Sequence, residues 1–316
     1  MRASQDRFTL WGIEVFLATV EEASISAAAR RLGTSPATVS QQLTNLEGAI
    51  GVTLLNRSHR PVLPTPAGET FRLRAQNIVN EATQARSELA LDGQALTSFR
   101  LGMIEDFDAD VTPRLLSGMA NDLKGCQFLL ETGASHRLFD LLDARALDIV
   151  VAADVGASGE WMDVHPLMRE DFIVAVPKGQ PTDADALKKM PLIQYTQRHH
   201  MGRSITAHLA RQRLNLAHQF ELDSYHAIMA MVAAGQGWTI FTPLGWLRAD
   251  RFREQVDVAP LPFGALSRTI SLTARRGILR DMPEQTAARL KGHLDEMIVK
   301  PASQRHPWLR DALTIL

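Results

Sequence analysis

The fold of the first ninety residues is decided by the segment SISAAARRLGTSPATVSQQLTNL, which runs from Ser24 to Leu46. It predicts two short helices joined by a tight turn. The first is rich in alanine, has Ser26 as its expected cap, and ends at Gly33, which can adopt the positive φ that closes a helix. The second begins with Ser35 as its cap and Pro36 in its first turn, where the missing N–H removes no hydrogen bond. Together they form the helix-turn-helix pattern.

The second of these helices has two different faces. Val39, Leu43, Leu46 and Ile50 recur at spacings of four, three and four, which is typical of a buried helical stripe. The opposite face carries short or amide-bearing side chains without charge, which suits contact with base edges in the major groove, with Gln41 as the best candidate. A plain solvated face is the alternative, but it would usually carry Glu and Lys. The residues of this helix predicted to bind DNA are Ser35, Pro36, Ala37, Thr38, Ser40, Gln41 and Thr44. Of these, Thr38, Ser40, Gln41 and Thr44 are expected to read bases.

A small excess of basic residues accompanies this pattern. The net charge of the chain is −1 at pH 7, so any affinity for nucleic acid has to come from a local concentration of basic side chains. Residues 23–74 carry six arginines and two glutamates, a local charge of +4. Two short strands flanking residues 58–61 predict a wing beside the helices. Phosphate contacts are predicted for Arg31, Arg57 and Arg60.

A long helix is predicted from Pro66 to Leu91, with Thr65 as its cap. Its apolar positions recur at steps of four and three over almost three heptads. A seam this narrow and rich in alanine needs a close partner, and a second copy of the helix is the simplest one; packing against the chain's own body is the alternative. The residues of this predicted dimerisation seam are Phe71, Ala75, Ile78, Ala82, Ala85 and Leu89.

Beyond Gly93 short β-rich runs alternate with helical stretches, which predicts α/β units with mostly parallel sheets. Composition supports a globular chain, because apolar residues make up 45% and charged residues 22%.

The chain has no apolar run of membrane-spanning length and no signal-peptide core, so we expect a cytoplasmic protein with no membrane partner. The single cysteine, Cys126, excludes a disulfide or a two-cysteine redox switch within one chain.

In order and spacing, these residues resemble the LysR-type transcriptional regulators. The resemblance extends from about Leu10 to about Leu294. The matching segments are 16–20, 24–32, 35–47, 51–57, 65–68, 147–151, 231–237 and Pro243. It implies an all-α N-terminal winged helix-turn-helix with a long linker helix, followed by a C-terminal α/β effector domain. That domain is expected to have two subdomains, like a periplasmic binding protein, with the effector held between them. The resemblance also implies homodimers that pair into a homotetramer.

The resemblance divides the chain into four parts. Residues 1–65 are the expected winged helix-turn-helix, 66–93 the linker and dimerisation helix, and 94–300 the effector-binding domain. Its subdomains are expected at about 94–168 with 266–300, and at 169–265. The tail, 301–316, extends past the usual end of the family, and it could dock on its own effector domain or on a neighbouring subunit.

The effector residues are predicted from a general rule that ligands of open α/β sheets lie beyond the carboxyl ends of strands, near helix N-termini. This rule selects four loops. Arg198 or Arg203 could pair with a ligand carboxylate, whereas the acids at 105, 106 and 108 hint at a cationic or donor group on the ligand; alternatively those acids pair with Arg198 or face solvent. The predicted effector-binding residues are Glu105, Asp106, Thr132, Gly133, Ala134, Tyr195, Thr196, Arg198, Asp223 and Thr242.

The function predicted from these patterns is a sequence-specific DNA-binding transcriptional regulator controlled by a small-molecule effector of unknown class. Its expected partners are a double-stranded DNA operator and a second copy of itself, with RNA polymerase as a candidate. The alternative is a small-molecule-binding protein or an enzyme with an accessory helical domain. We find no GxSxG, P-loop, GxGxxG or HExxH motif in the sequence and expect no enzyme activity and no cofactor. No metal is expected, because adjacent His199 and His200 point in different directions and no third ligand is evident.

Overall fold

The computed structural model describes residues 7–90, 96–156 and 159–316, except for the side chains of residues 84 and 87–90. The chain divides into two compact units. The first contains residues 1–92 with 144–146, and the second contains 93–143 with 147–316. Within the described ranges, no helix combines the length and the apolar character needed to span a membrane.

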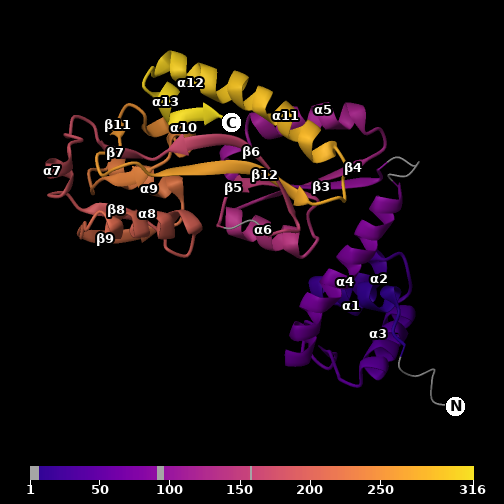
Figure 1. Cartoon of the computed structure of the whole chain (residues 1–316). Coiled ribbons are helices and arrows are strands. Elements are labelled where there is room, and N and C mark those ends of the chain that lie inside the picture. The colour runs from indigo at the N-terminus through magenta and orange to yellow at the C-terminus, as the bar shows by residue number, and fades with distance from the viewer. Residues whose placement is uncertain (1–6, 91–95, 157–158) are drawn as a thin grey trace. The chain divides into compact units, whose positions relative to one another are not determined.

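Residues 7–90 of the N-terminal unit form four helices and a two-stranded wing (Figure 1). Its core is formed by side chains such as Phe16, Leu43 and Leu46, each at most 1% exposed. The helix-turn-helix prediction is confirmed: Gly33 has a φ of +63°, and the Ser35 hydroxyl accepts a hydrogen bond from the Thr38 N–H at 3.1 Å. The elements are α1 Leu10–Glu22, α2 Ile25–Arg31, α3 Pro36–Ile50, β1 Leu55–Asn56, β2 Leu63–Pro64 and α4 Pro66–Ala90.

The start of α2 differs from the prediction. Ser24, rather than Ser26, caps this helix, and its hydroxyl accepts from the Ala27 N–H at 3.3 Å. Because α2 begins at Ile25, that side chain packs against the core of the unit. The earlier start therefore adds a half-buried apolar side chain to the packing of this helix.

Helix α4 begins as predicted, but its first turns belong to the N-terminal core. The Thr65 hydroxyl accepts from the Gly68 N–H at 3.0 Å. Phe71 packs edge-on against Phe16, with ring centroids 5.2 Å apart, and Ala75 is fully buried. The prediction that Phe71 and Ala75 face a partner helix is therefore corrected, since a core contact already covers them.

The second unit contains a six-stranded sheet with the order β13-β6-β12-β5-β3-β4. Helices α5 and α11 pack against each other, and α11 lies along β6 and β12, while α6 contacts β5 from the opposite face (Figure 1). Since both faces are covered there, every residue of β5 is buried. The elements of this subdomain are β3 Ser98–Met103, η1 Glu105–Phe107, α5 Val111–Asp122, β4 Gln127–Thr132, α6 Ser135–Asp143, β5 Ile149–Ala153, β6 Met162–Asp171, β12 Ser267–Arg275 and α11 Met282–Leu294.

The expectation of mostly parallel sheets is wrong. Strand β3 pairs in parallel with β4 and β5, but β12 runs antiparallel to both β5 and β6. The cause lies in the connection between the subdomains: the chain leaves the sheet along β6 and returns along β12, so these neighbouring strands run in opposite directions.

The second subdomain is built on two short sheets, β10-β7-β11 and the parallel pair β8-β9. Trp238 is its largest fully buried side chain, and its indole N–H donates to the Met190 carbonyl at 3.2 Å. Its elements are β7 Ile173–Pro177, α7 Ala184–Leu187, β8 Leu192–Tyr195, α8 His200–Arg211, β9 His218–Leu222, α9 Tyr225–Ala233, β10 Thr239–Phe241, α10 Pro243–Arg248, η2 Asp250–Phe252 and β11 Val256–Pro260.

The tail docks on the chain's own second unit. A π-helical turn, Asp295–Val299, joins α11 to α12 Lys300–Arg305, which is followed by α13 Leu309–Ala312 and β13 Leu313–Ile315. Strand β13 pairs antiparallel with β6, with Leu313 opposite Glu170. The tail therefore covers an edge of the large sheet that would otherwise present unpaired backbone groups.

Candidate DNA interface and effector cavity

The predicted reading face of α3 is accessible to a partner molecule. Six of its seven predicted residues are exposed, and Ser40 is half-buried. The Gln41 side-chain amide donates to the Asn45 side-chain oxygen at 2.8 Å, so two neighbouring amides are oriented together on this face. Such a pair presents both donors and acceptors, as contact with base edges requires.

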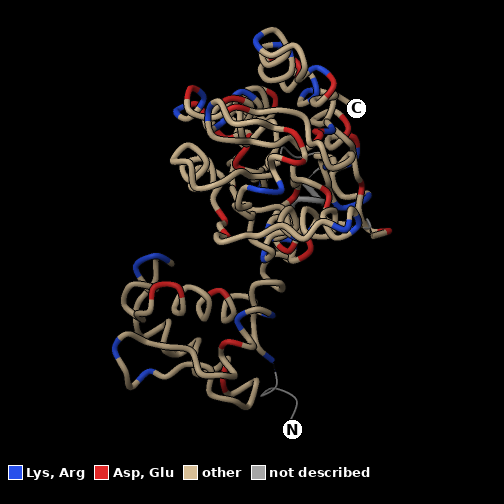
Figure 2. The backbone as a smooth tube through the Cα atoms, turned by 90° about the vertical axis from the view of Figure 1, so that its left-hand side faces the viewer, with Lys and Arg blue, Asp and Glu red and all other residues tan. Residues whose placement is uncertain are grey.

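The three predicted phosphate contacts differ in their surroundings. Arg31 is half-exposed and pairs with Glu21 at 2.5 Å and Glu22 at 3.3 Å. Arg60 is exposed, with no ion pair among the described residues. Figure 2 shows the basic positions of this unit as separate short stretches rather than one continuous run.

Arg57 has an internal role that sequence reasoning missed. Its guanidinium pairs with Glu47 and donates to the Thr44 hydroxyl at 3.1 Å. Glu47 also accepts from the N–H groups of Leu54 and Leu55, at 2.7 and 3.0 Å. Glu47 therefore fastens the wing to α3, and Arg57 neutralises the carboxylate that does so.

The second unit contains a cavity of about 300 Å³ between its two subdomains. Its lining comes from η1, the start of α6, β5 and β12 in one subdomain, and from β8, α8, α9 and α10 in the other. Thr242 lines it while capping α10, since its hydroxyl accepts from the Gly245 N–H at 3.2 Å. The predicted effector residues that line this cavity are Glu105, Asp106, Gly133, Ala134, Tyr195, Asp223 and Thr242.

Three predicted residues are not part of this lining. Thr132 donates to the Asp108 carboxylate at 3.2 Å. Thr196 is buried and donates to Glu221 at 2.7 Å. The Arg198 side chain is 81% exposed and lies 3.9 Å from the Asp223 carboxylate. The contacts of these three side chains are thus with residues of neighbouring loops and strands rather than with the cavity space.

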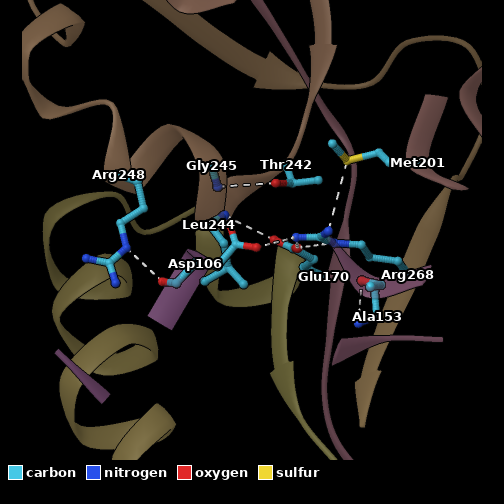
Figure 3. Close-up of polar contacts among 10 residues, drawn as sticks. Asp106, Ala153, Glu170, Met201, Thr242, Leu244, Gly245, Arg248 and Arg268 are labelled. Carbon is cyan, nitrogen blue, oxygen red and sulfur yellow. Dashed lines mark hydrogen bonds and ion pairs between the residues drawn. The ribbon is translucent and has the colours of Figure 1, made fainter. Parts of the chain in front are cut away.

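Arg268 of β12, whose side chain is 16% exposed, also lines the cavity, and sequence reasoning missed it (Figure 3). Its guanidinium lies 2.5 Å from the Glu170 carboxylate and 3.3 Å from that of Asp106. The alternative that the acids after β3 pair with Arg198 is thus corrected for Asp106, whose partner is Arg268. No local pattern marks this contact, because Asp106 and Arg268 are 162 positions apart in the chain.

Glu170 and Arg268 shift each other's ionisation. Glu170 is fully buried, and its second oxygen accepts from the Leu244 N–H at 3.0 Å. Burial raises the pKa of Glu170, and the charge of Arg268 limits that rise. Burial also disfavours the charged guanidinium, but Glu170 and Asp106 outweigh this and raise the pKa of Arg268. Arg268 therefore stays charged and is neutralised from two sides.

Histidines and aromatic rings complete the lining. His136 and His199 lie with their ring centroids 5.4 Å apart. Burial lowers the pKa values of His199 and His200, which keeps both rings neutral near pH 7. Both histidines line the cavity, and the described residues contain no cluster of three or more side chains that could hold a metal ion. The aromatic lining residues are Phe172, Tyr195, Tyr225 and Phe241.

Cys126 lies outside this cavity lining, just before β4, and is half-buried. Burial raises the pKa of its thiol. Since the thiolate is the reactive form, this environment makes Cys126 a poor nucleophile.

Comparisons with known proteins agree with this two-part architecture. A model of the bacterial regulatory helix-turn-helix protein, lysR family, matches residues 10–69, and a model of the LysR substrate binding domain matches residues 92–290. A probable hydrogen peroxide-inducible genes activator of Mycobacterium avium is 30% identical over 295 residues, which is 90% of this chain and 94% of the relative. The DNA-binding transcriptional dual regulator OxyR of Escherichia coli (strain K12) is 26% identical, over 90% of this chain and 97% of its own.

Solved structures share the fold. A full-length OxyR variant from Pseudomonas aeruginosa superposes with a TM-score of 0.65 at 22% identity, over 90% of this chain and 95% of that one. CbnR, a LysR family transcriptional regulator, has a TM-score of 0.63 at 17% identity, and the match covers 92% of this chain and 99% of CbnR. The structure of CbnR with its target DNA has a TM-score of 0.62 at 18% identity, and the match covers 92% of this chain and 99% of that one.

Proposed function

Because the chain belongs to the LysR family of DNA-binding transcriptional regulators, we propose that α3 reads its operator and that a small molecule in the cavity of the second unit controls this reading. The observation that carries the proposal is the exposed, uncharged face of α3 in the same chain as a cavity between two subdomains. Ligand binding that favours one subdomain arrangement would shift the population of the protein toward it. The cavity residues act here by binding, and we propose no catalytic step.

Base reading is assigned to Thr38, Ser40, Gln41 and Thr44, with Gln41 as the main contact. Ser35, Pro36 and Ala37 place the helix start against the groove. Arg60 is the proposed phosphate contact of the wing, because it is exposed, and Arg31 that of α2. For Arg57, the internal bonds to Glu47 and Thr44 leave a phosphate contact as a secondary role.

Substitution of Gln41 by alanine is expected to lower discrimination between the operator and a scrambled duplex by about 5- to 150-fold, the equivalent of about 1–3 kcal/mol for one bidentate base contact. Affinity for the scrambled duplex should stay the same, because phosphate contacts are retained. The operator is first selected from random duplexes, and both affinities are then measured at one salt concentration.

Gln76→Ala is the matched control for this substitution. Gln76 lies on α4 and donates to Asn80 at 3.0 Å, four positions along, as Gln41 does to Asn45. It should leave discrimination unchanged. An unaltered preference in Gln41→Ala would remove Gln41 from the reading face.

Dimerisation is proposed through the part of α4 beyond the N-terminal core. Ile78 is 39% exposed, Ala85 is exposed and Ala82 is half-buried. Leu73 is 64% exposed as well, but it lies on another face of the helix, about 140° around the axis from Ile78. The side chain of Leu89 lies outside the described residues. Two such helices, one from each subunit, would hold two helix-turn-helix units in position for a two-fold symmetric operator.

Ile78→Glu is expected to raise the dimer dissociation constant at least about tenfold, because burial of an isoleucine contributes about 1.5–3 kcal/mol. Sedimentation of the full chain over a concentration series measures this. Asn77→Glu, at an exposed position one residue away, adds the same charge and should leave the dissociation constant unchanged. Equal weakening by both variants would place the seam elsewhere.

Two further features of the family are proposed for this chain. Dimers pair into tetramers, and bound DNA brings the protein into contact with RNA polymerase.

The relatives' names refer to hydrogen peroxide, but Cys126 is the only cysteine of the sequence, so no intrachain disulfide can form. We therefore propose control by a bound molecule rather than by a disulfide.

A further inference from the structure

The cavity of the second unit has an excess of carboxylates. Among the described lining residues, Glu105, Asp106, Asp154 and Asp223 are acidic, whereas Arg268 is the one guanidinium. Arg268 is already neutralised by Glu170 and Asp106. It is therefore a poor partner for an anionic ligand, which would have to compete with two bound carboxylates.

Two of these carboxylates have no ion-pair partner among the described residues. Neither Glu105 nor Asp154 forms an ion pair within the described part of the chain, and they approach the cavity from η1 and from the end of β5. Partial burial raises the pKa of both carboxyls; for Glu105 the charges of Asp106 and Asp108 raise it further, and the charge of His226 opposes this rise. A bound cation would relieve this cost, since an opposite charge favours the ionised carboxylate.

The remaining lining suits an organic cation rather than a metal ion. Phe172, Tyr225 and Phe241 supply aromatic surface, which attracts both apolar groups and cations. Tyr195 is 8% exposed and lines the cavity, and its hydroxyl has no hydrogen-bond partner among the described residues. Burial, followed by the charge of Asp106, raises the pKa of Tyr195. Its neutral hydroxyl is therefore free to accept a hydrogen bond from an ammonium or guanidinium group.

We infer that the effector is a small organic cation, an amine or guanidine with an apolar body, held by Glu105 and Asp154 against the aromatic wall of this cavity. The inference rests on the proposed function, since it names the ligand class of the cavity assigned there. The ammonium or guanidinium end meets the carboxylates, and the apolar end meets the rings. A volume of about 300 Å³ suits a molecule of this kind.

The test uses the full chain and sets of probes that match in size and differ in charge. One set is 2-phenylethylamine, 2-phenylethanol and 3-phenylpropanoate; a second is butylamine, butanol and butyrate; agmatine adds a guanidine. Calorimetric titration near pH 7 measures the dissociation constants. In the set that binds best, the amine should bind at least tenfold more tightly than the alcohol of the same size, and the carboxylate should not bind. Operator affinity is measured with and without each probe in the same preparation.

Neutral isosteres locate the charge. Asp154→Asn and Glu105→Gln should each weaken binding of 2-phenylethylamine about tenfold or more, and leave the alcohol unaffected. Asp185→Asn is the control, because Asp185 lies on α7, outside the cavity lining, with its side chain 85% exposed. Should Asp154→Asn fail to fold, Glu105→Gln still decides the matter, because Glu105 is only partly removed from solvent and forms no ion pair in the described part of the chain.

Each outcome has a distinct meaning. Carboxylates that bind more tightly than the amines, or alcohols that bind equally well, would overturn the cationic assignment and leave the proposed effector cavity intact. Amine binding that is insensitive to both isosteres would also overturn it. If no probe of any charge binds or alters operator affinity, both the cationic effector and the proposed control by a cavity ligand fail.

Discussion

Arg268→Met is expected to lower the free energy of unfolding of the second unit by about 3–5 kcal/mol, because it leaves Glu170 buried without its counter-charge. Glu170 cannot turn to water, since its other oxygen holds the Leu244 N–H at the start of α10. Urea denaturation followed by tryptophan fluorescence measures the loss. Four of the five tryptophans lie in the second unit, so the signal reports mainly on it.

The loss in Arg268→Met should depend on pH. Burial already raises the pKa of Glu170, and removal of the arginine raises it further. A carboxyl whose folded pKa lies above its unfolded value carries no penalty at a pH below both, and a growing penalty as the pH rises through that range. The deficit should therefore be largest at neutral pH and shrink toward pH 4.

Two further variants separate charge from size in this test. Arg268→Met with Glu170→Gln should recover much of the loss, because no unpaired charge remains and an amide oxygen can still accept from Leu244. Arg169→Met is the surface control: Arg169 is 47% exposed in its pair with Asp171, so its loss should stay below about 1 kcal/mol. A deficit equal to that control, or independent of pH, would contradict the buried-pair argument.

Glu47→Ala is expected to lower the free energy of unfolding of the N-terminal unit by about 2–4 kcal/mol, since each unsatisfied buried donor costs about 1–3 kcal/mol. The substitution leaves the N–H groups of the buried Leu54 and Leu55 without their acceptor and Arg57 without its carboxylate. The wing then loses its attachment to α3, so affinity for specific and scrambled duplexes should fall together. Faster hydrogen exchange at the two leucine amides gives the direct measurement.

Glu69→Ala is the matched control for Glu47→Ala. Glu69 also pairs with an arginine of the same unit, Arg72, but its side chain is 53% exposed. Its removal should cost less than about 1 kcal/mol. For Glu47→Gln, which keeps one acceptor oxygen, the loss in free energy of unfolding should lie between those of Glu47→Ala and Glu69→Ala. Equal losses for Glu47→Ala and Glu69→Ala would show that the backbone hydrogen bonds contribute nothing to the wing.

Local patterns made the N-terminal helices predictable. The turn at Gly33 and the cap at Ser35 depend on backbone conformation and on bonds that span three residues, so neighbouring positions suffice to predict them. The heptad steps of α4 were equally visible, but a periodic apolar stripe does not specify its partner. Only the fold shows that Phe71 and Ala75 meet the core of their own unit, while Ile78 is left exposed.

For the cavity, the sequence identified four of the loops that line it, because the end of a strand followed by a helix start is a local signal; it did not identify Asp154 after β5 or the start of β12. Seven of the ten predicted effector residues line the cavity for this reason. The sequence could not reveal that Asp106 and Glu170 share Arg268, which meets them across 162 and 98 positions of chain. That meeting depends on β12 returning beside β6, and it decides which charges in the cavity stay unpaired. The sequence alone therefore predicts side-chain chemistry and local backbone conformation. The pairing of charges in a buried site depends on tertiary contacts between strands that are distant in the sequence.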